Sequence, residues 1–169
     1  MKNKFLAAAL LVNALALPLS DAAAQDSAGE PKQGDVTAVI SGLSHHFGQR
    51  SYWDENGQNR KWNETNYGAG LEYQLSKHFY VAAGGYKNSI HRASFYGGVG
   101  AETNGGKPLG LGIEAGLITG YEIPVVPSVI PYVRIGSRNA PVNLKINVIP
   151  PIKGLTPAVV AVQARFKIG

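Results

Sequence analysis

The chain has 169 residues, with 16 Lys and Arg, 11 Asp and Glu, and no Cys. The absence of Cys excludes a disulfide framework and a thiolate metal site. The modest positive charge, which lacks basic runs, argues against nucleic-acid binding but is compatible with an anionic lipid surface.

The N-terminal segment has the three parts of a secretory signal peptide. Lys2 and Lys4 are basic, residues 5–19 are mostly apolar, and three alanines at 22–24 form a cleavage site before Gln25. The apolar run is too short and wrongly flanked for a membrane anchor, which is the alternative. We expect residues 1–24 to be removed, which leaves one domain without disulfides. Closing a sheet into a membrane barrel is one way to stabilise such a chain.

Residues 25–34 are polar, and we expect a flexible lead there. Beyond it, in residues 35–169, almost every segment alternates between apolar and polar or glycine positions with a period of two, which is typical of strands. Residues 63–75 and 142–148 are the clearest cases. The pattern predicts eight strands, near residues 35–47, 63–75, 78–89, 94–102, 109–120, 128–136, 142–149 and 157–168.

The polar face of these segments decides the class of sheet. It carries Glu, Lys, Arg, Gln and many Gly in nearly every predicted strand. Together with a signal peptide, this predicts an all-β, eight-stranded antiparallel transmembrane β-barrel of the outer membrane, apolar outside and polar inside. A soluble lipocalin-like barrel is the alternative. The short turns at 76–77, 103–108 and 137–141 are predicted to be periplasmic, and the polar loop 48–62 extracellular.

Two neighbouring histidines end the first predicted strand. His46 shares its face with Gly42 and Ser44, whereas His45 shares its face with the apolar Leu43 and Phe47. We therefore expect His46 to point inward, where it could act as a general base beside a Ser, and His45 to point outward. A solvated rim histidine is the alternative. The four His have no metal-ligand spacing, so no metal site is predicted.

Prolines cluster at two places in the predicted barrel wall. Because proline donates no N–H, each cluster predicts either a weak place in the strand ladder, and thus a lateral opening, or an ordinary loop. The residues are Pro124, Pro127 and Pro131 near the sixth strand, and Pro150 and Pro151 after the seventh.

Five stretches in this order resemble the PagP-like lipid A palmitoyltransferase family of the outer membrane. They are "SHHF", "WNETNYGAGLEY", "VAAGGYKNSIHRASFYGGVGAE", "YEIPVVPSVIPYVRIG" and "NVIPPIKGLTPAVVAVQARF", which together extend along most of the chain. The resemblance implies a catalytic His at His46, with His45 as the alternative, and a catalytic Ser at Ser89. The family's catalytic Asp falls on Asn88, whose amide holds no negative charge.

The resemblance also implies a function, the transfer of an acyl chain from a phospholipid to lipid A without a cofactor. From the signal peptide, the eight alternating segments and the absence of Cys, we expect the barrel to be a monomer. His91 and Arg92 would contact the phosphates or sugars of lipid A. Gly98 and Gly100 would line an acyl pocket inside the barrel, and the two proline clusters would be lateral gates for lipid. Two rival functions remain: a non-enzymatic scaffold or adhesion barrel, and a hydrolase that deacylates lipids.

Overall fold

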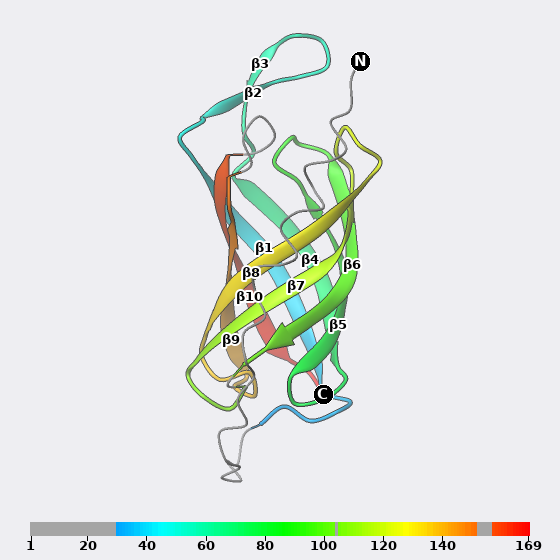
Figure 1. The fold of residues 1–169 in the computed structure, drawn as a ribbon, viewed down its shortest axis with the longest axis vertical. Coiled ribbons are helices and arrows are strands. Elements are labelled where there is room, and N and C mark those ends of the chain that lie inside the picture. The colour runs from blue at the N-terminus through cyan, green and yellow to red at the C-terminus, as the bar shows by residue number, and fades with distance from the viewer. Residues whose placement is uncertain (1–29, 104, 152–156) are drawn as a thin grey trace.

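The computed structural model describes residues 30–103, 105–151 and 157–169. Eight strands close into an antiparallel barrel in the order β1-β10-β9-β8-β7-β6-β5-β4 (Figure 1). These strands confirm the predicted all-β, eight-stranded barrel, and the largest shift of a boundary is at β8, which begins three residues early. They are β1 (Val36–Phe47), β4 (Thr65–Gln74), β5 (Phe79–Lys87), β6 (Ala93–Glu102), β7 (Leu109–Thr119), β8 (Val125–Ile135), β9 (Val142–Ile149) and β10 (Ala158–Lys167). The proposed signal peptide lies outside the described residues.

The outer face of the barrel is apolar. Large hydrophobic side chains of the long strands point outward, and Leu43, for example, is 63% exposed. Exposed aromatic side chains lie near both ends of the strands, a distribution typical of barrels in a bilayer. They are Phe47, Tyr67 and Phe95 near one end, and Tyr73, Phe79 and Phe166 near the other. The described residues contain no helix long and apolar enough to cross a membrane.

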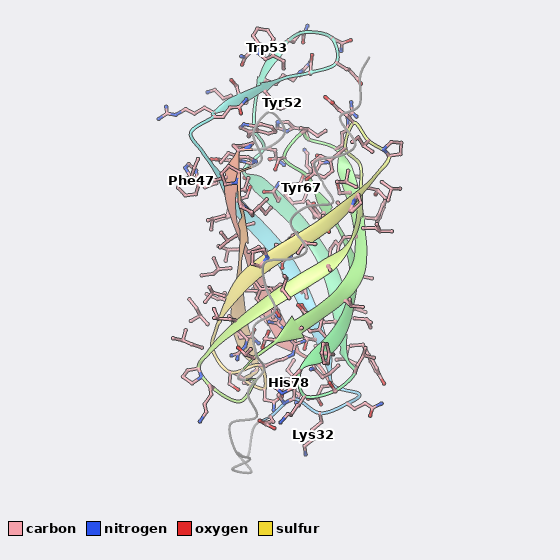
Figure 2. All side chains as sticks on the ribbon, viewed as in Figure 1. Lys32, Phe47, Tyr52, Trp53, Tyr67 and His78 are labelled. Atoms are coloured by element: carbon pink, nitrogen blue, oxygen red, sulfur yellow. The ribbon has the colours of Figure 1, made fainter. Side chains whose placement is uncertain are left out.

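The two ends of the barrel differ. At the hairpin end, the loop after β1 forms β2 (Ser51–Trp53) and β3 (Asn59–Lys61), a small hairpin that the sequence analysis described only as a polar loop. Figure 2 shows Tyr52 and Trp53 on this hairpin, and Lys32 and His78 at the opposite end. That opposite turn end carries the short turns β4–β5, β6–β7 and β8–β9 together with the C-terminus (Figure 1).

The described part of the N-terminal lead is held against the turn end. Pro31 is buried, and a Cβ placed on Gly105 would collide with its ring. The N–H of Gly34 donates to the carbonyl of Gln74 at 2.9 Å. Residues 31–34 therefore contact the barrel, although their polar sequence predicted a loose segment.

A buried ionic network fills the lumen near the turn end. Arg138 and Arg165 each donate to both Glu72 and Glu102, and each of these four side chains is at most 3% exposed. Arg134 pairs with Glu102, and Lys145 lies between Glu72 and Glu114. Buried charges require such pairing because removing each charged group from water carries a large desolvation free energy. The Tyr80 ring occupies the space over Gly100, and the Tyr132 ring occupies the space over Gly112.

Each pair of neighbouring strands in the barrel meets along a seam of backbone hydrogen bonds, and one of these seams is shorter than the others. β8 and β9 share four residue pairs, from Tyr132 with Asn147 to Ile135 with Leu144, whereas the other seams have seven to eleven. Among the described residues, the part of β8 from residue 125 to 131 has no partner on β9.

The register explains why this pairing stops. The N–H of Gly136 donates to the carbonyl of Pro108 across the β7–β8 seam, so even-numbered residues of β8 bond to β7. The backbone groups of odd-numbered residues, including Pro127 and Pro131, then point toward β9. Pro131 immediately precedes Tyr132, the first residue of β8 that pairs with β9, and has no N–H to donate. The seam therefore ends where proline interrupts the ladder.

Candidate functional site

His46 and Ser89 meet at the hairpin end of the lumen. The Nε2 atom of His46 lies 3.0 Å from the Oγ atom of Ser89, within hydrogen-bond reach. His46 is near the end of β1 and is 5% exposed, as the alternation predicts for an inward side chain. The neighbouring His45 side chain is 61% exposed. The structure thus brings together the His and the Ser that lie 43 positions apart in the chain.

Ser89 is presented by a tight turn after β5. The N–H of Asn88 donates to the carbonyl of Arg92 at 2.8 Å, and His91 within the turn has a positive φ of 64°. The carbonyl of Ser89 accepts the N–H of Asn63 at 2.8 Å. These backbone bonds hold the backbone of Ser89 beside the residues that precede β4.

The buried Asn88 amide holds this turn and makes no hydrogen bond to His46. Its Oδ1 atom accepts the N–H groups of Ile90 and Arg92, at 3.1 and 2.8 Å. Its Nδ2 atom donates to Ser94 Oγ and to the carbonyl of Gly120, at 3.0 and 2.8 Å. All the polar capacity of the amide is used in this way, so the structure assigns Asn88 a place in the turn.

Two aromatic rings cover the other side of His46. Trp62 stacks on the imidazole, with ring centroids 4.7 Å apart and planes 3° from parallel, and Tyr52 stacks on Trp62. Tyr52 belongs to the β2–β3 hairpin, so the hairpin packs over the site. The sequence analysis missed both residues. The only available signal was the presence of aromatic side chains in an otherwise polar loop.

A carboxylate also lies beside the histidine. Glu64 Oε1 accepts the backbone N–H of His46 at 3.0 Å and lies 3.7 Å from His46 Nδ1. The same atom is 3.0 Å from Nδ1 of His45. The backbone N–H of His46 holds the pKa of the Glu64 carboxyl below its usual range, so this carboxyl is ionised at neutral pH.

A cavity of about 110 Å³ extends from Ser89 toward the ionic network. Its lining includes Tyr86 near the site, Ile130 and Ile149 beside the unpaired part of β8, and Glu114 and Lys145 at its floor. This volume is small compared with the roughly 300–1,000 Å³ of typical ligand pockets.

The two predicted pocket glycines lie elsewhere in the wall. Gly98 packs against the backbone of Gly116, and Gly100 is covered by the Tyr80 ring. Neither is part of the described lining of the cavity.

His91 and Arg92 connect the turn to the hairpin region. His91 Nε2 lies 3.2 Å from the carbonyl oxygen of Lys61, and Arg92 pairs with Glu55 at 3.0 Å. Both side chains are exposed at the hairpin end, and their contact with lipid stays a prediction.

The prolines divide between strand and loop: Pro127 and Pro131 lie within β8, and Pro124, Pro150 and Pro151 lie outside the strands.

Comparisons with known proteins bear on the fold alone. No protein-family model matches this sequence, and no curated protein matches it. Among solved structures, one from "De novo design of transmembrane beta-barrels" superimposes with a TM-score of 0.57 and 13% sequence identity. The match covers 82% of this chain and 99% of the designed chain. The chain therefore has the fold of a small transmembrane β-barrel.

Proposed function

We propose that this barrel lies in the outer membrane and transfers an acyl chain from a phospholipid to lipid A. The observation that carries the proposal is the 3.0 Å contact between His46 Nε2 and Ser89 Oγ at the hairpin end. A hydroxyl within hydrogen-bond reach of an imidazole is the arrangement that activates a serine for acyl transfer.

The proposed reaction has two steps. His46 removes the proton from Ser89 Oγ as this oxygen attacks the ester carbonyl of the phospholipid, and it returns the proton to the departing lysophospholipid. A hydroxyl of lipid A then gives its proton to His46 and attacks the acyl-serine, and His46 returns this proton to the departing Ser89 Oγ. No cofactor takes part, because each proton moves through His46.

Access from the bilayer supports this proposal. The lining of the cavity beside Ser89 includes Ile130, within the stretch where β8 has no partner on β9, and Ile149 at the end of β9. A lipid in the outer leaflet could place its ester at Ser89 through this opening. We propose that Pro127 and Pro131 keep the seam open, in line with a lateral gate.

The lumen also limits where the acyl chain can lie. A palmitoyl-like chain would have to pass Gly100 to lie wholly inside the barrel, and the Tyr80 ring and the ionic network occupy that level. We therefore propose that the end of the chain stays in the bilayer beside the β8–β9 seam.

Mass spectrometry of lipid A from cells with and without the gene tests the proposal against its two rivals. We expect a gain of one acyl chain when the protein is present. A loss of an acyl chain would instead indicate a hydrolase that uses water at the same Ser89. Unchanged lipid A, together with intact barrels in the membrane, would indicate a scaffold or adhesion barrel.

A further inference from the structure

We infer that Glu64 is the carboxylate that positions His46, a role that the resemblance places at residue 88. The inference rests on the proposed function of His46 and Ser89. It differs from that proposal because it concerns which group holds the imidazole in its reactive tautomer and orientation.

The backbone places Glu64 beside the histidine. Glu64 immediately precedes β4, which pairs with β1, and its carbonyl accepts the N–H of Ser44 at 2.9 Å. Its carboxylate then accepts the N–H of His46 at 3.0 Å. Two contacts with β1 therefore hold both ends of this residue, and the carboxylate can move only a short distance relative to the imidazole.

The unused nitrogen of His46 faces this carboxylate. Nδ1 is buried and has no hydrogen-bond partner among the described residues, whereas Nε2 is engaged with Ser89. Glu64 Oε1 is 3.7 Å away from Nδ1, slightly beyond hydrogen-bond distance. Catalytic hydrogen bonds in unliganded sites are often long and tighten when substrate binds. A movement of less than 1 Å would complete this bond.

The bond would select the tautomer that the reaction needs. With the proton on Nδ1 and donated to Glu64, the lone pair of Nε2 is free to accept the proton of Ser89. The negative charge of Glu64 also stabilises the imidazolium that forms when Ser89 is deprotonated. Asn88 supplies neither effect, because its amide is bonded to Ser94, Gly120 and the backbone of the turn.

His45 moderates the size of the effect. Its Nδ1 atom lies 3.0 Å from the same Glu64 oxygen, and the Glu64 side chain is 46% exposed. Solvent and a second histidine therefore weaken the field of the carboxylate at His46 relative to a fully buried partner.

The test compares Glu64→Gln and Glu64→Asp in the purified full-length barrel in detergent, with a defined phospholipid donor and lipid A as acceptor. Gln keeps the shape and one oxygen but removes the charge. We expect kcat to fall about 10–10²-fold with KM unchanged, less than for a fully buried carboxylate. Asp restores the charge and is expected to retain more activity than Gln. Glu122→Gln removes an exposed carboxylate in the β7–β8 loop and is the matched control.

A second measurement does not depend on turnover. Long-range ¹H–¹⁵N spectra of the barrel, with His46→Ala used for assignment, report which ring nitrogen of His46 carries the proton. We expect the Nδ1–H tautomer in the wild type and a mixture of tautomers in Glu64→Gln. An unchanged tautomer together with wild-type kcat in Glu64→Gln would overturn the inference. Retained activity in Ser89→Ala would overturn the proposed function instead, whatever Glu64 does.

Discussion

At the scale of single residues, neighbours in the sequence have different tasks. Ser89 turns its hydroxyl toward His46, whereas Asn88 turns its amide into the wall and bonds to Gly120. The same separation holds for the two histidines, because His46 is buried and His45 is exposed. Alternation along a strand and the geometry of one turn are sufficient to produce both differences.

The first prediction concerns the pair itself. His46→Ala and Ser89→Ala should each lower the rate of acyl transfer by about 10²–10⁴-fold or more, because each removes one partner of the proton transfer. Both barrels should still fold. The measurement is acyl transfer by purified variants in detergent with a defined phospholipid donor.

Controls for this pair come from the turn end and from the neighbouring histidine. His78→Ala and Ser137→Ala, at the turn end, should leave the rate unchanged. His45→Ala should leave most of the activity, since its side chain points outward. Loss of activity in His45→Ala with full activity in His46→Ala would favour the alternative histidine. Full activity in both Ser89→Ala and His46→Ala would exclude catalysis by this pair, and a non-enzymatic scaffold barrel would then be the remaining function.

Asn88→Asp is the second prediction. The family resemblance alone suggests that a carboxylate here would preserve or raise activity, but the bonds of the amide suggest the opposite. An ionised Asp would lose both donors and would place a negative oxygen 2.8 Å from the carbonyl of Gly120. We expect a loss of about 1–3 kcal/mol in the free energy of unfolding and a drop in activity.

Thermal unfolding in detergent, followed by circular dichroism, measures the effect of Asn88→Asp. Asn56→Asp makes the same change of charge on the exposed hairpin and should have little effect. A variant that is both stable and more active would mean that position 88 serves His46 directly.

At the scale of strands, the prolines of β8 decide where the barrel wall is paired. Pro131 and Pro127 both direct their backbone toward β9, and pairing with β9 begins only at Tyr132, the residue after Pro131. The same strand is fully paired with β7, because there the bonds come from its even-numbered residues. One edge of β8 is therefore complete while the other is open.

The third prediction follows from this asymmetry. Pro127→Ala with Pro131→Ala restores two N–H donors, so the β8–β9 ladder should extend toward the hairpin end. Each new hydrogen bond contributes about 0.5–1.5 kcal/mol, which offsets about 0.4–1 kcal/mol lost per proline through greater freedom of the unfolded chain. We expect slower acyl transfer with unchanged or higher thermal stability. Pro150→Ala, after β9, should act in the same direction.

Initial rates and melting temperatures in detergent measure the effect of the proline changes. Pro141→Ala, in the β8–β9 turn, is the control. Transfer rates that equal the wild type in the combined variant would show that the prolines are plain structural residues and that lipid enters elsewhere.

At the scale of the whole molecule, the barrel is apolar outside and ionic inside. The outer face carries the exposed Leu, Ile, Val and aromatic side chains, and the lumen near the turn end carries paired Arg, Lys and Glu. A soluble barrel of this kind would expose an apolar patch far larger than the few hundred Å² that soluble monomers show. A bilayer removes that conflict because the outer face then contacts lipid.

The fourth prediction is that the mature protein is a membrane-embedded monomer. It should fractionate with outer membranes and retain β-type circular dichroism when heated in mild detergent, since all eight strands belong to one closed sheet. Cross-linking in membranes should detect single chains. Recovery of folded protein from the soluble periplasmic fraction would contradict the prediction and favour a lipocalin-like binder.

The alternation of residues determined much of the fold by itself. A period of two over each segment predicts a strand, and the polar character of the second face predicts a closed barrel with a polar lumen. The same parity placed His46 inside and His45 outside, because a strand leaves each side chain only two directions. These features depend on local geometry, so the sequence contains them directly.

Other features depend on contacts between distant segments. Three polar or aromatic residues lie close to the site residues, namely Trp62 and Glu64 before β4 and Asn88 next to Ser89. Which of them faces His46 depends on the register of β1 with β4 and on the turn at 88–92. The filling of the lumen at Gly100 depends on where Tyr80 falls across the sheet. Strand pairing brings together residues tens of positions apart, and no local pattern records that register. The contacts of His46 with Glu64 and Trp62, and the shape of the cavity, were therefore decided by the tertiary structure alone.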